Sequence, residues 1–196
     1  MKKFIVAISR QYGSRGNIIG AKLAEALGVE FCDKTIVSRA AKESGFSEAF
    51  VEMMEREKPG SFLYAMSAAG LGMSVYDEVF IAESKVIKEV AQKGSAVIIG
   101  RCADYILRND PACIRVFIHA PMDLRIHNAT SYYDKDDAES RVKSRDKSRA
   151  AYYNYFTANK WGELKNYDIT LNSAIGVDKC VGILKKYVEE YAKKED

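Results

Sequence analysis

The segment that most constrains the fold lies at the start of the chain, where a short apolar run, a polar turn and a helical pattern follow one another. Residues 4–8 are apolar and mostly β-branched, which predicts a buried strand. Residues 9–17 are polar and contain Gly13 and Gly16, and apolar residues then recur at helical spacing over 18–28. A strand that leads through such a turn into a helix directs backbone N–H groups at one spot, so the segment predicts a cradle for an anion.

Charged side chains in the turn fit this prediction. Arg10 and Arg15 carry guanidinium groups, which form charge-assisted hydrogen bonds with phosphate. The turn departs from the standard phosphate-binding pattern G-x-x-x-x-G-K-[ST], because Gly16 stands where the lysine belongs and Asn17 where the serine or threonine belongs. We expect Arg15 to supply the charge of the missing lysine. The alternative interpretation is a turn that uses glycine only for tight geometry.

The rest of the chain alternates between strand and helix patterns. Further apolar runs predict strands at residues 30–32, 96–99, 114–119 and 167–171. Helical patterns occupy residues 34–45, a stretch after Ser47, and residues 76–93, 103–107, 121–130 and 177–191. This order is typical of an α/β fold, a parallel sheet covered by helices on both faces. Since ligands bind at the carboxyl ends of such strands, we expect 9–17, Asp33, Arg101 and His119 to lie on one rim. Asp33 is also expected to cap the helix that follows it.

Two stretches have neither pattern. Residues 61–74 are rich in Gly, Ala, Ser and Met, and we interpret them as a mobile, partly helical insertion. Residues 132–149 are almost wholly polar, and aromatic residues follow from Tyr152 to Trp161. The polar stretch is either a segment that closes over a site or a solvated helix face with pairs such as Asp137–Arg141.

Charge and cysteine content argue against several classes of protein. The net charge of +3 is not gathered into a basic arm, so nucleic acid is not an expected partner. The four cysteines lie far apart without a C-x-x-C pair, which argues against a zinc site and a disulfide scaffold. No apolar run approaches the length of a membrane span, and the run after Lys2-Lys3 is too short for a signal peptide. We therefore expect a soluble, cytoplasmic protein without a membrane partner.

Four pieces of the sequence together carry a resemblance to a known family. They are Ile8 to Ser14 with Gly16 and Gly20; Phe31-Cys32-Asp33 with Arg39; Ile99-Gly100-Arg101; and Arg145-Asp146 with Arg149, Tyr152-Tyr153, Trp161 and Tyr167-Asp168. In these pieces the chain resembles the cytidylate kinase-like group of P-loop nucleoside monophosphate kinases, over nearly its whole length. The resemblance implies one domain over 1–196, in the three-layer P-loop kinase fold, with a five-stranded parallel sheet in the order 2-3-1-4-5. It also implies a helical monophosphate-binding insertion at 33–93 and a short lid at 131–150.

The resemblance further implies a reaction, the transfer of the γ-phosphoryl group of ATP, with Mg²⁺, to CMP or dCMP. From the turn we assign to ATP the residues Arg10, Gly13, Ser14, Arg15, Gly16 and Asn17, with Asn17 also near Mg²⁺. The residues expected at the acceptor nucleotide are Asp33, Lys34, Arg39 and Arg101, of which Lys34, Arg39 and Arg101 match positions of the family. The residues expected in catalysis are Asp146 and Arg149, which match a lid pair of the family, together with Arg15 and Arg145.

Three positions depart from the family pattern. Cys102 replaces the aspartate of a Gly-Arg-Asp motif, and Lys34 replaces a serine or threonine that helps to bind the sugar or base. Val142 stands where the family has a lid arginine, whose place Arg141 or Arg145 could take. Because of these departures and of the missing lysine in the phosphate loop, two other functions stay open. One is a nucleotide- or phosphate-binding module without activity, and the other is a small-molecule kinase with a different acceptor.

Overall fold

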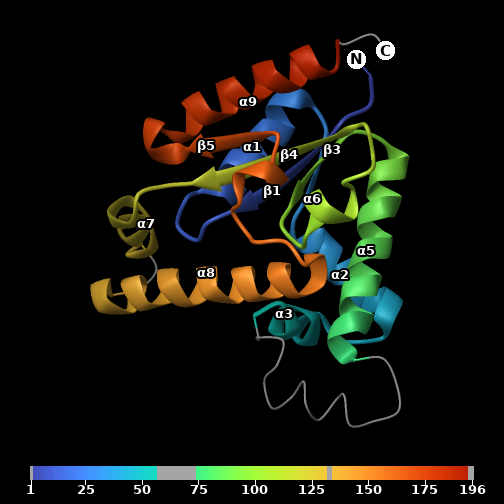
Figure 1. The fold of residues 1–196 in the computed structure, drawn as a ribbon, viewed down its shortest axis with the longest axis horizontal. Helices are drawn as coiled ribbons and strands as arrows, with labels where there is room; N and C mark the ends of the chain where they lie inside the picture. Colours follow the sequence, from blue (N-terminus) through green and yellow to red (C-terminus); the bar gives the residue numbers. More distant parts are fainter. Residues whose placement is uncertain (1, 57–73, 132–133, 194–196) are drawn as a thin grey trace.

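The chain folds into an open α/β sheet with helices on both faces (Figure 1). The computed structural model describes residues 2–56, 74–131 and 134–193. The strands are β1 (Ile5–Arg10), β2 (Glu30–Cys32), β3 (Ala96–Ile99), β4 (Cys113–His119) and β5 (Ile169–Asn172). The α-helices are α1 (Gly16–Leu27), α2 (Lys34–Ser44), α3 (Glu48–Arg56), α5 (Val75–Lys93), α6 (Ala103–Ile106), α7 (Met122–Ala129), α8 (Lys135–Thr157) and α9 (Val177–Tyr191). Two short 3₁₀ helices are η1 (Leu164–Asn166) and η2 (Ser173–Ile175).

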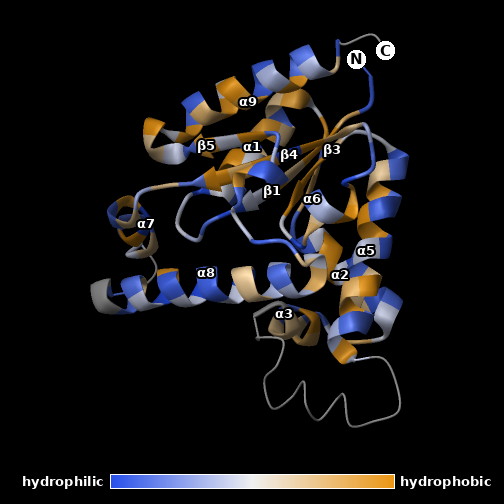
Figure 2. Ribbon diagram, in the orientation of Figure 1, coloured by the Kyte–Doolittle hydropathy of each residue, from blue (hydrophilic) through white to orange (hydrophobic). Residues whose placement is uncertain are grey.

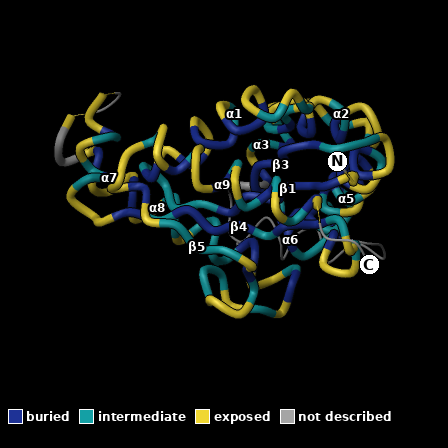
Figure 3. The backbone as a smooth tube through the Cα atoms, turned by 90° about the horizontal axis from the view of Figure 1, so that it is seen from above, coloured by how far each residue is buried: buried dark blue, intermediate teal, exposed yellow. Residues whose placement is uncertain are grey.

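The sheet has the expected topology. All strand pairs are parallel and the order is β2-β3-β1-β4-β5, which confirms the α/β P-loop kinase sheet order. Central β1 pairs through Ile5 with Ala96 of β3 on one side and with Cys113 of β4 on the other. β1, β3 and β4 are mostly buried, whereas the edge strand β5 is only half-buried (Figure 3). The parallel arrangement brings the carboxyl ends of the strands to one edge of the sheet.

Alternate residues of the strands build two separate cores. Val6 and Ile8 of β1 pack with residues of α1 and α9 such as Leu23 and Leu184. Ile5 and Ala7, one step along the same strand, face the opposite way and pack with residues of α2, α5 and α6. Figure 2 shows the apolar colour concentrated in the strands and on the helix sides turned toward them. The sheet is therefore the middle layer of three.

Helix boundaries follow most of the local signals in the sequence. α1 ends before Gly28 and α2 before Gly45, as expected, although α1 begins earlier than predicted, at Gly16. The Phe50 N–H donates to Ser47 Oγ at 3.2 Å, which caps α3. The capping prediction for Asp33 is wrong, because its side chain makes no capping hydrogen bond and instead lies 3.3 Å from Arg101.

Residues 135–149 of the polar stretch and the aromatic residues from Tyr152 to Phe156 form one continuous helix, α8, and Trp161 lies beyond its end. At one end of it Ala138 and Val142 pack against α7, and at the other Tyr152 and Tyr153 are buried. Residues 135–150 of the expected lid are therefore the first part of a helix whose other end is buried in the core. The insertion expected at 61–74 lies outside the described residues, apart from Ser74, whose Oγ caps α5. Among the described helices, none is long and apolar enough to cross a membrane.

Candidate functional site

The β1–α1 loop, residues 11–15, leaves the sheet at the carboxyl end of β1 and is held by hydrogen bonds on its inner side. The Gln11 N–H donates to the Ile118 carbonyl of β4 at 2.9 Å, and Gln11 Oε1 accepts from the Ala120 N–H at 3.1 Å. The buried Ser14 hydroxyl donates to the Gln11 carbonyl at 2.8 Å. The Ser14 side chain, expected beside a phosphate, therefore shapes the loop.

Helix α7 packs against this loop at Gly13. The backbone of Gly13 is left-handed, with φ +78°, and a Cβ atom there would collide with the backbone carbonyl of Arg125. Asn128 Nδ2 donates to the Gly13 carbonyl at 2.8 Å. Both the conformation and the close approach of α7 thus require glycine at this position.

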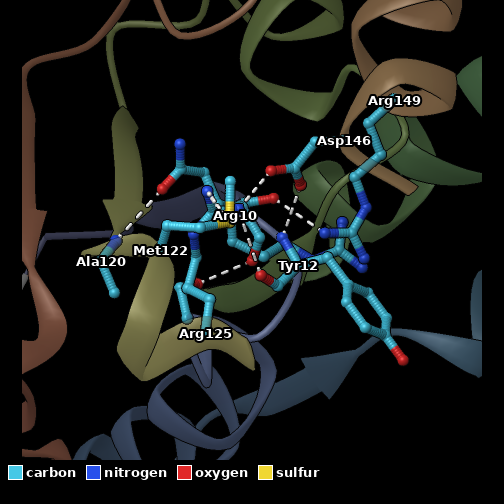
Figure 4. Close-up of polar contacts among 9 residues, drawn as sticks. Arg10, Tyr12, Ala120, Met122, Arg125, Asp146 and Arg149 are labelled. Atoms are coloured by element: carbon cyan, nitrogen blue, oxygen red, sulfur yellow. Dashed lines mark hydrogen bonds and ion pairs between the residues drawn. The ribbon is translucent and has the colours of Figure 1, made fainter. Parts of the chain in front are cut away.

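Helix α8 holds the same loop from another side (Figure 4). Asp146 Oδ1 accepts from the Tyr12 N–H at 2.7 Å, and Asp146 Oδ2 forms an ion pair with the buried Arg125 of α7. Arg149 donates to the Arg10 carbonyl at 3.0 Å, and its guanidinium lies over the Tyr12 ring, 5.6 Å from the centroid. Asp146 therefore joins the loop, α7 and α8, and lines neither of the cavities described next.

Two adjoining cavities open at the carboxyl edge of the sheet. The loop cavity, of about 340 Å³, is lined by the β1–α1 loop, the first residues of α1 and the end of α7, including Arg15, Gly16 and Asn17. The strand-end cavity, of about 300 Å³, lies beyond β3 against α8. The residues that line both are Arg10, Tyr12, Asp33 and Arg149. The two spaces therefore meet at a boundary that carries two arginines and one aspartate.

The loop cavity has the features of an anion site. The N–H groups in the first turn of α1, at Gly16, Asn17 and Ile18, have no intrahelical acceptor, and the positive end of the helix lies there. Arg15 precedes them with a left-handed backbone, φ 59°, and is exposed. Arg10, Arg15 and Asn17, predicted from the sequence, thus line one space.

The strand-end cavity collects cations from four elements or loops. They are Arg10 at the end of β1, Lys34 at the start of α2, Arg101 after β3, and Arg145 and Arg149 on α8. Tyr152, Tyr153 and Trp161 form an aromatic wall beside them. Arg39, predicted at the same site, lines neither cavity, because it turns to α5 and pairs with Glu89 at 2.6 Å.

The residues after β3 have an unusual backbone. Gly100, Arg101 and Cys102 follow one another with φ of 72°, 52° and 54°. Left-handed conformations cost a non-glycine residue about 1 kcal/mol or more, and such costs concentrate at functional sites. The Arg101 side chain, 8% exposed, turns back so that its Nη1 lies 3.3 Å from Asp33 Oδ1 and 3.3 Å from the Ile99 carbonyl.

Two buried carboxylates lie behind the strand-end cavity. Glu83 of α5 accepts from the Tyr152 hydroxyl at 2.8 Å and lies 3.3 Å from Arg101 Nε. Asp104 of α6 accepts from the Tyr153 hydroxyl at 2.8 Å and from Ser9 Oγ at 3.3 Å. Burial raises the pKa of Asp104, while the hydrogen bonds from Tyr153 and Ser9 act in the opposite direction.

Sequence reasoning missed Glu83, Asp104, Arg125 and Asn128. One signal was available for Glu83, which stands on the apolar stripe of α5 between Val79 and Val86. A charged residue on an inward helix face must find a partner in the core. No local pattern marks the others, because tertiary contacts alone create their roles.

The described residues fit a nucleotide with Mg²⁺. The loop cavity offers helix N–H groups and arginines to phosphates. Among its described lining residues Asp33 is the only carboxylate, and Asn17 adds an amide oxygen. The described parts of the chain contain no cluster of three or more His, Cys, Asp or Glu side chains that could hold a metal ion. Mg²⁺ needs few protein ligands when phosphates and water supply the rest, so this set is sufficient.

The fold is shared with several solved structures. An uncharacterised protein from Eubacterium ventriosum superposes with a TM-score of 0.71 at 26% identity, over 95% of this chain and 99% of that one. A shikimate kinase from Acinetobacter baumannii gives 0.54 at 18% identity, over 96% and 94%. A gluconokinase from Sinorhizobium meliloti gives 0.55 at 14% identity, over 97% and 94%. The last two similarities show that this chain shares the fold of these two kinases.

Sequence comparison identifies the family. A cytidylate kinase from Methanopyrus kandleri is 25% identical in an alignment of 120 residues that covers 56% of this chain. The chain spans only 62% of the length of that protein. The profile of the cytidylate kinase-like family matches residues 5–175, which include β1, the strand ends, all of α8 and β5. This chain therefore belongs to the cytidylate kinase-like family.

Proposed function

We propose that the protein transfers the γ-phosphoryl group of ATP to a nucleoside monophosphate, with CMP and dCMP as the first candidates. The observation that carries this proposal is the pair of adjoining cavities with Arg10 and Arg149 at their common boundary. Phosphoryl transfer requires two phosphate groups in line and positive charge around the group that moves. Two cationic spaces that share a wall of arginines meet this requirement.

In this proposal the loop cavity binds the triphosphate. The first turn of α1 and Arg15 would hold the β- and γ-phosphates, and Asn17 and Asp33, which line the same cavity, would contact Mg²⁺ or its bound water. When bound, Mg²⁺ supplies positive charge to the phosphates. Arg10, Arg15 and Arg149 would together supply the charge that the missing lysine gives in other P-loop enzymes. The family relationship supports the choice of ATP.

The strand-end cavity would bind the acceptor. Arg101 and Arg145 offer planar guanidinium groups to its phosphate, and Lys34 adds a third charge. Tyr152, Tyr153 and Trp161 offer flat surfaces beside these cations. Asp146, proposed as catalytic, would act by keeping α8 on the β1–α1 loop, and Arg39 would act on the acceptor only after leaving Glu89. The region 33–93 would serve as the monophosphate-binding part and 131–150 as the lid.

The direct test measures ADP release by the purified protein with ATP and Mg²⁺. The acceptors compared are CMP, dCMP, UMP, AMP, shikimate, gluconate and none. Stimulation by CMP or dCMP supports the proposal. Measurable ATP binding with equal ADP release in every sample contradicts it and favours a nucleotide-binding module. Stimulation by shikimate or gluconate alone would assign the chain to the small-molecule kinases that share its fold.

Replacement of Arg101 tests which cavity holds which substrate. The Arg101→Ala variant should abolish measurable acceptor use and leave the ATP dissociation constant within about twofold of the wild-type value, since Arg101 lines only the strand-end cavity. Arg108→Ala, at an exposed site that lines neither cavity, is the control for loss of an arginine. Loss of ATP binding in Arg101→Ala would show that the two sites are assigned the wrong way round.

A further inference from the structure

Glu83 is a carboxylate placed inside an apolar helix face. It lies on α5, is 0% exposed, and has Val79 and Val86 on the same stripe. Transfer of an ionised carboxylate from water to such a place is unfavourable unless the charge is paired and hydrogen-bonded. The partners of Glu83 therefore indicate why the residue is there.

Two contacts of Glu83 lead directly to the strand-end cavity. Oε2 accepts from the hydroxyl of Tyr152 at 2.8 Å, and Oε1 lies 3.3 Å from Nε of Arg101. Both partners line the cavity, whereas Glu83 does not. Arg101 is 8% exposed, so its charge is also largely removed from water.

The contacts on the guanidinium define its orientation. Nε forms an ion pair with Glu83 Oε1 at 3.3 Å, while Nη1 lies 3.3 Å from Asp33 Oδ1, at the boundary between the two cavities. The left-handed backbone of Arg101 brings the side chain back over the end of β3. One edge of the guanidinium thus faces a buried carboxylate, and the end that carries Nη1 lies toward the site.

We propose that Glu83 is a positioning residue, which fixes the Nε edge of Arg101 so that the Nη end binds an anionic phosphate group in the strand-end cavity. This inference rests on the proposed function in so far as that phosphate belongs to the acceptor. Without Glu83, Arg101 is a nearly buried cation that has lost its buried counter-charge, and it moves toward water. Anion binding in the strand-end cavity weakens, while the loop cavity, which contains neither residue, is unchanged.

If Glu83 acted only through its charge, its neutralisation would change the phosphate affinity in the opposite direction. If Glu83 only reduced the positive potential at Arg101, its neutralisation would strengthen phosphate binding. The variants Glu83→Gln, which removes the charge at constant shape, and Glu83→Asp, which keeps the charge but withdraws it by one methylene, separate the two effects. Positioning predicts weaker binding in both variants.

The first experiment uses inorganic phosphate as the probe, so that it does not depend on kinase activity. The full-length protein with isotope-labelled arginine is titrated with phosphate, and the Nε–H resonance of Arg101 is followed by NMR. The signal is assigned by its loss in Arg101→Lys. We expect the phosphate dissociation constant to rise about tenfold in Glu83→Gln and Glu83→Asp, the size of one charge-assisted hydrogen bond. The matched control is Glu78→Gln, the same change on the same helix at a residue that lines neither cavity.

The second experiment uses CMP and ATP. Glu83→Gln should raise KM for CMP about tenfold and leave KM for ATP within about twofold. In an Arg101→Ala background, where phosphate binding is followed through the Nε–H resonance of Arg145 in the same cavity, Glu83→Gln should cause no further change in the dissociation constant, because the effect passes through Arg101.

Three results would overturn the inference. The first is phosphate binding that is unchanged or tighter in Glu83→Gln. The second is an equal loss of ATP affinity and phosphate affinity in that variant. The third is a loss of phosphate affinity on Glu83→Gln that persists in the Arg101→Ala background. If no nucleoside monophosphate is phosphorylated but phosphate binding shows the predicted loss, the proposed function fails and the role of Glu83 stands.

Discussion

Gly13 is the residue on which the contact between the β1–α1 loop and α7 depends. An alanine there would keep a left-handed backbone and would also press its Cβ into the Arg125 carbonyl. We predict that Gly13→Ala lowers the free energy of unfolding by about 3 kcal/mol, the sum of a left-handed alanine and an overpacked contact. Urea denaturation measures the loss.

A second glycine separates the two contributions. Gly28, after α1, has φ +66°, and a Cβ there would meet nothing within 4 Å. Gly28→Ala should therefore cost only about 1 kcal/mol, from the backbone alone. Equal losses of unfolding free energy in Gly13→Ala and Gly28→Ala would show that the close approach of α7 to Gly13 adds nothing to the loss.

Single residues also show where sequence reasoning succeeds. Arg10 and Arg101 could be placed at the site because each stands at or directly after the end of a buried parallel strand, and strand ends share one edge of the sheet. Arg39 could not be placed, because its direction depends on Glu89 of α5, far along the chain. Glu83 acquires its role only when α5 and α8 enclose the residues after β3.

Among the elements, α8 makes contacts that could not be predicted from its sequence. Its long polar stretch has no continuous apolar stripe, so the sequence left open a closing segment or a solvated helix face there, with an aromatic cluster beyond it. The structure joins them because specific contacts hold the helix, through Asp146 and Arg149 near its middle and the two buried tyrosines near its end. Strands and short helices with clear apolar periodicity were predicted closely, since burial alone determines them.

The ion pair between Asp146 and Arg125 is the main link between α7, α8 and the loop. Arg125 is 6% exposed, so Asp146→Ala leaves a buried cation without this partner and removes the acceptor for the Tyr12 N–H. We predict a loss of about 3 kcal/mol in the free energy of unfolding, measured with urea. Nucleotide binding should weaken as well, because the loop loses one of its contacts with α8.

The matched control lies on the same helix. Glu139 pairs with Lys143 at an exposed site, so Glu139→Ala should cost about 0.5 kcal/mol or less. A similar cost for Asp146→Ala and Glu139→Ala would mean that the contact of α8 with the loop adds little to stability.

For the molecule as a whole, buried carboxylates make stability depend on pH. The pKa of Asp104 is raised by burial, so between its unfolded value of about 4 and its raised folded value the native state binds more protons than the unfolded state. The contribution of Asp104 to the free energy of unfolding is therefore present below a pH of about 4, and it is lost as the pH rises through the raised pKa. Relative to wild type, Asp104→Asn should become progressively more stable as the pH rises over that window, as measured by urea denaturation at a series of pH values.

Asp168 should act with the opposite sign. Burial alone would raise its pKa, but the hydrogen bonds and charge of Arg115 outweigh burial and lower it. The contribution of Asp168 to the free energy of unfolding is present above a pH of about 4, and it is lost as the pH falls through the lowered pKa. The stability advantage of wild type over Asp168→Asn should therefore shrink in acid. Parallel curves for wild type and both variants would contradict the roles of both carboxylates.

The anchoring of α8 has a consequence for the entropy of ligand binding. Tyr152 and Tyr153 fasten one end of the helix to carboxylates in the core, and Asp146 and Arg149 fasten its middle to the β1–α1 loop. The wall shared by the two cavities is consequently ordered when the chain folds. A ligand that enters either cavity meets preorganised arginines, so less of its interaction energy is consumed in restricting the chain, and more of it appears as affinity.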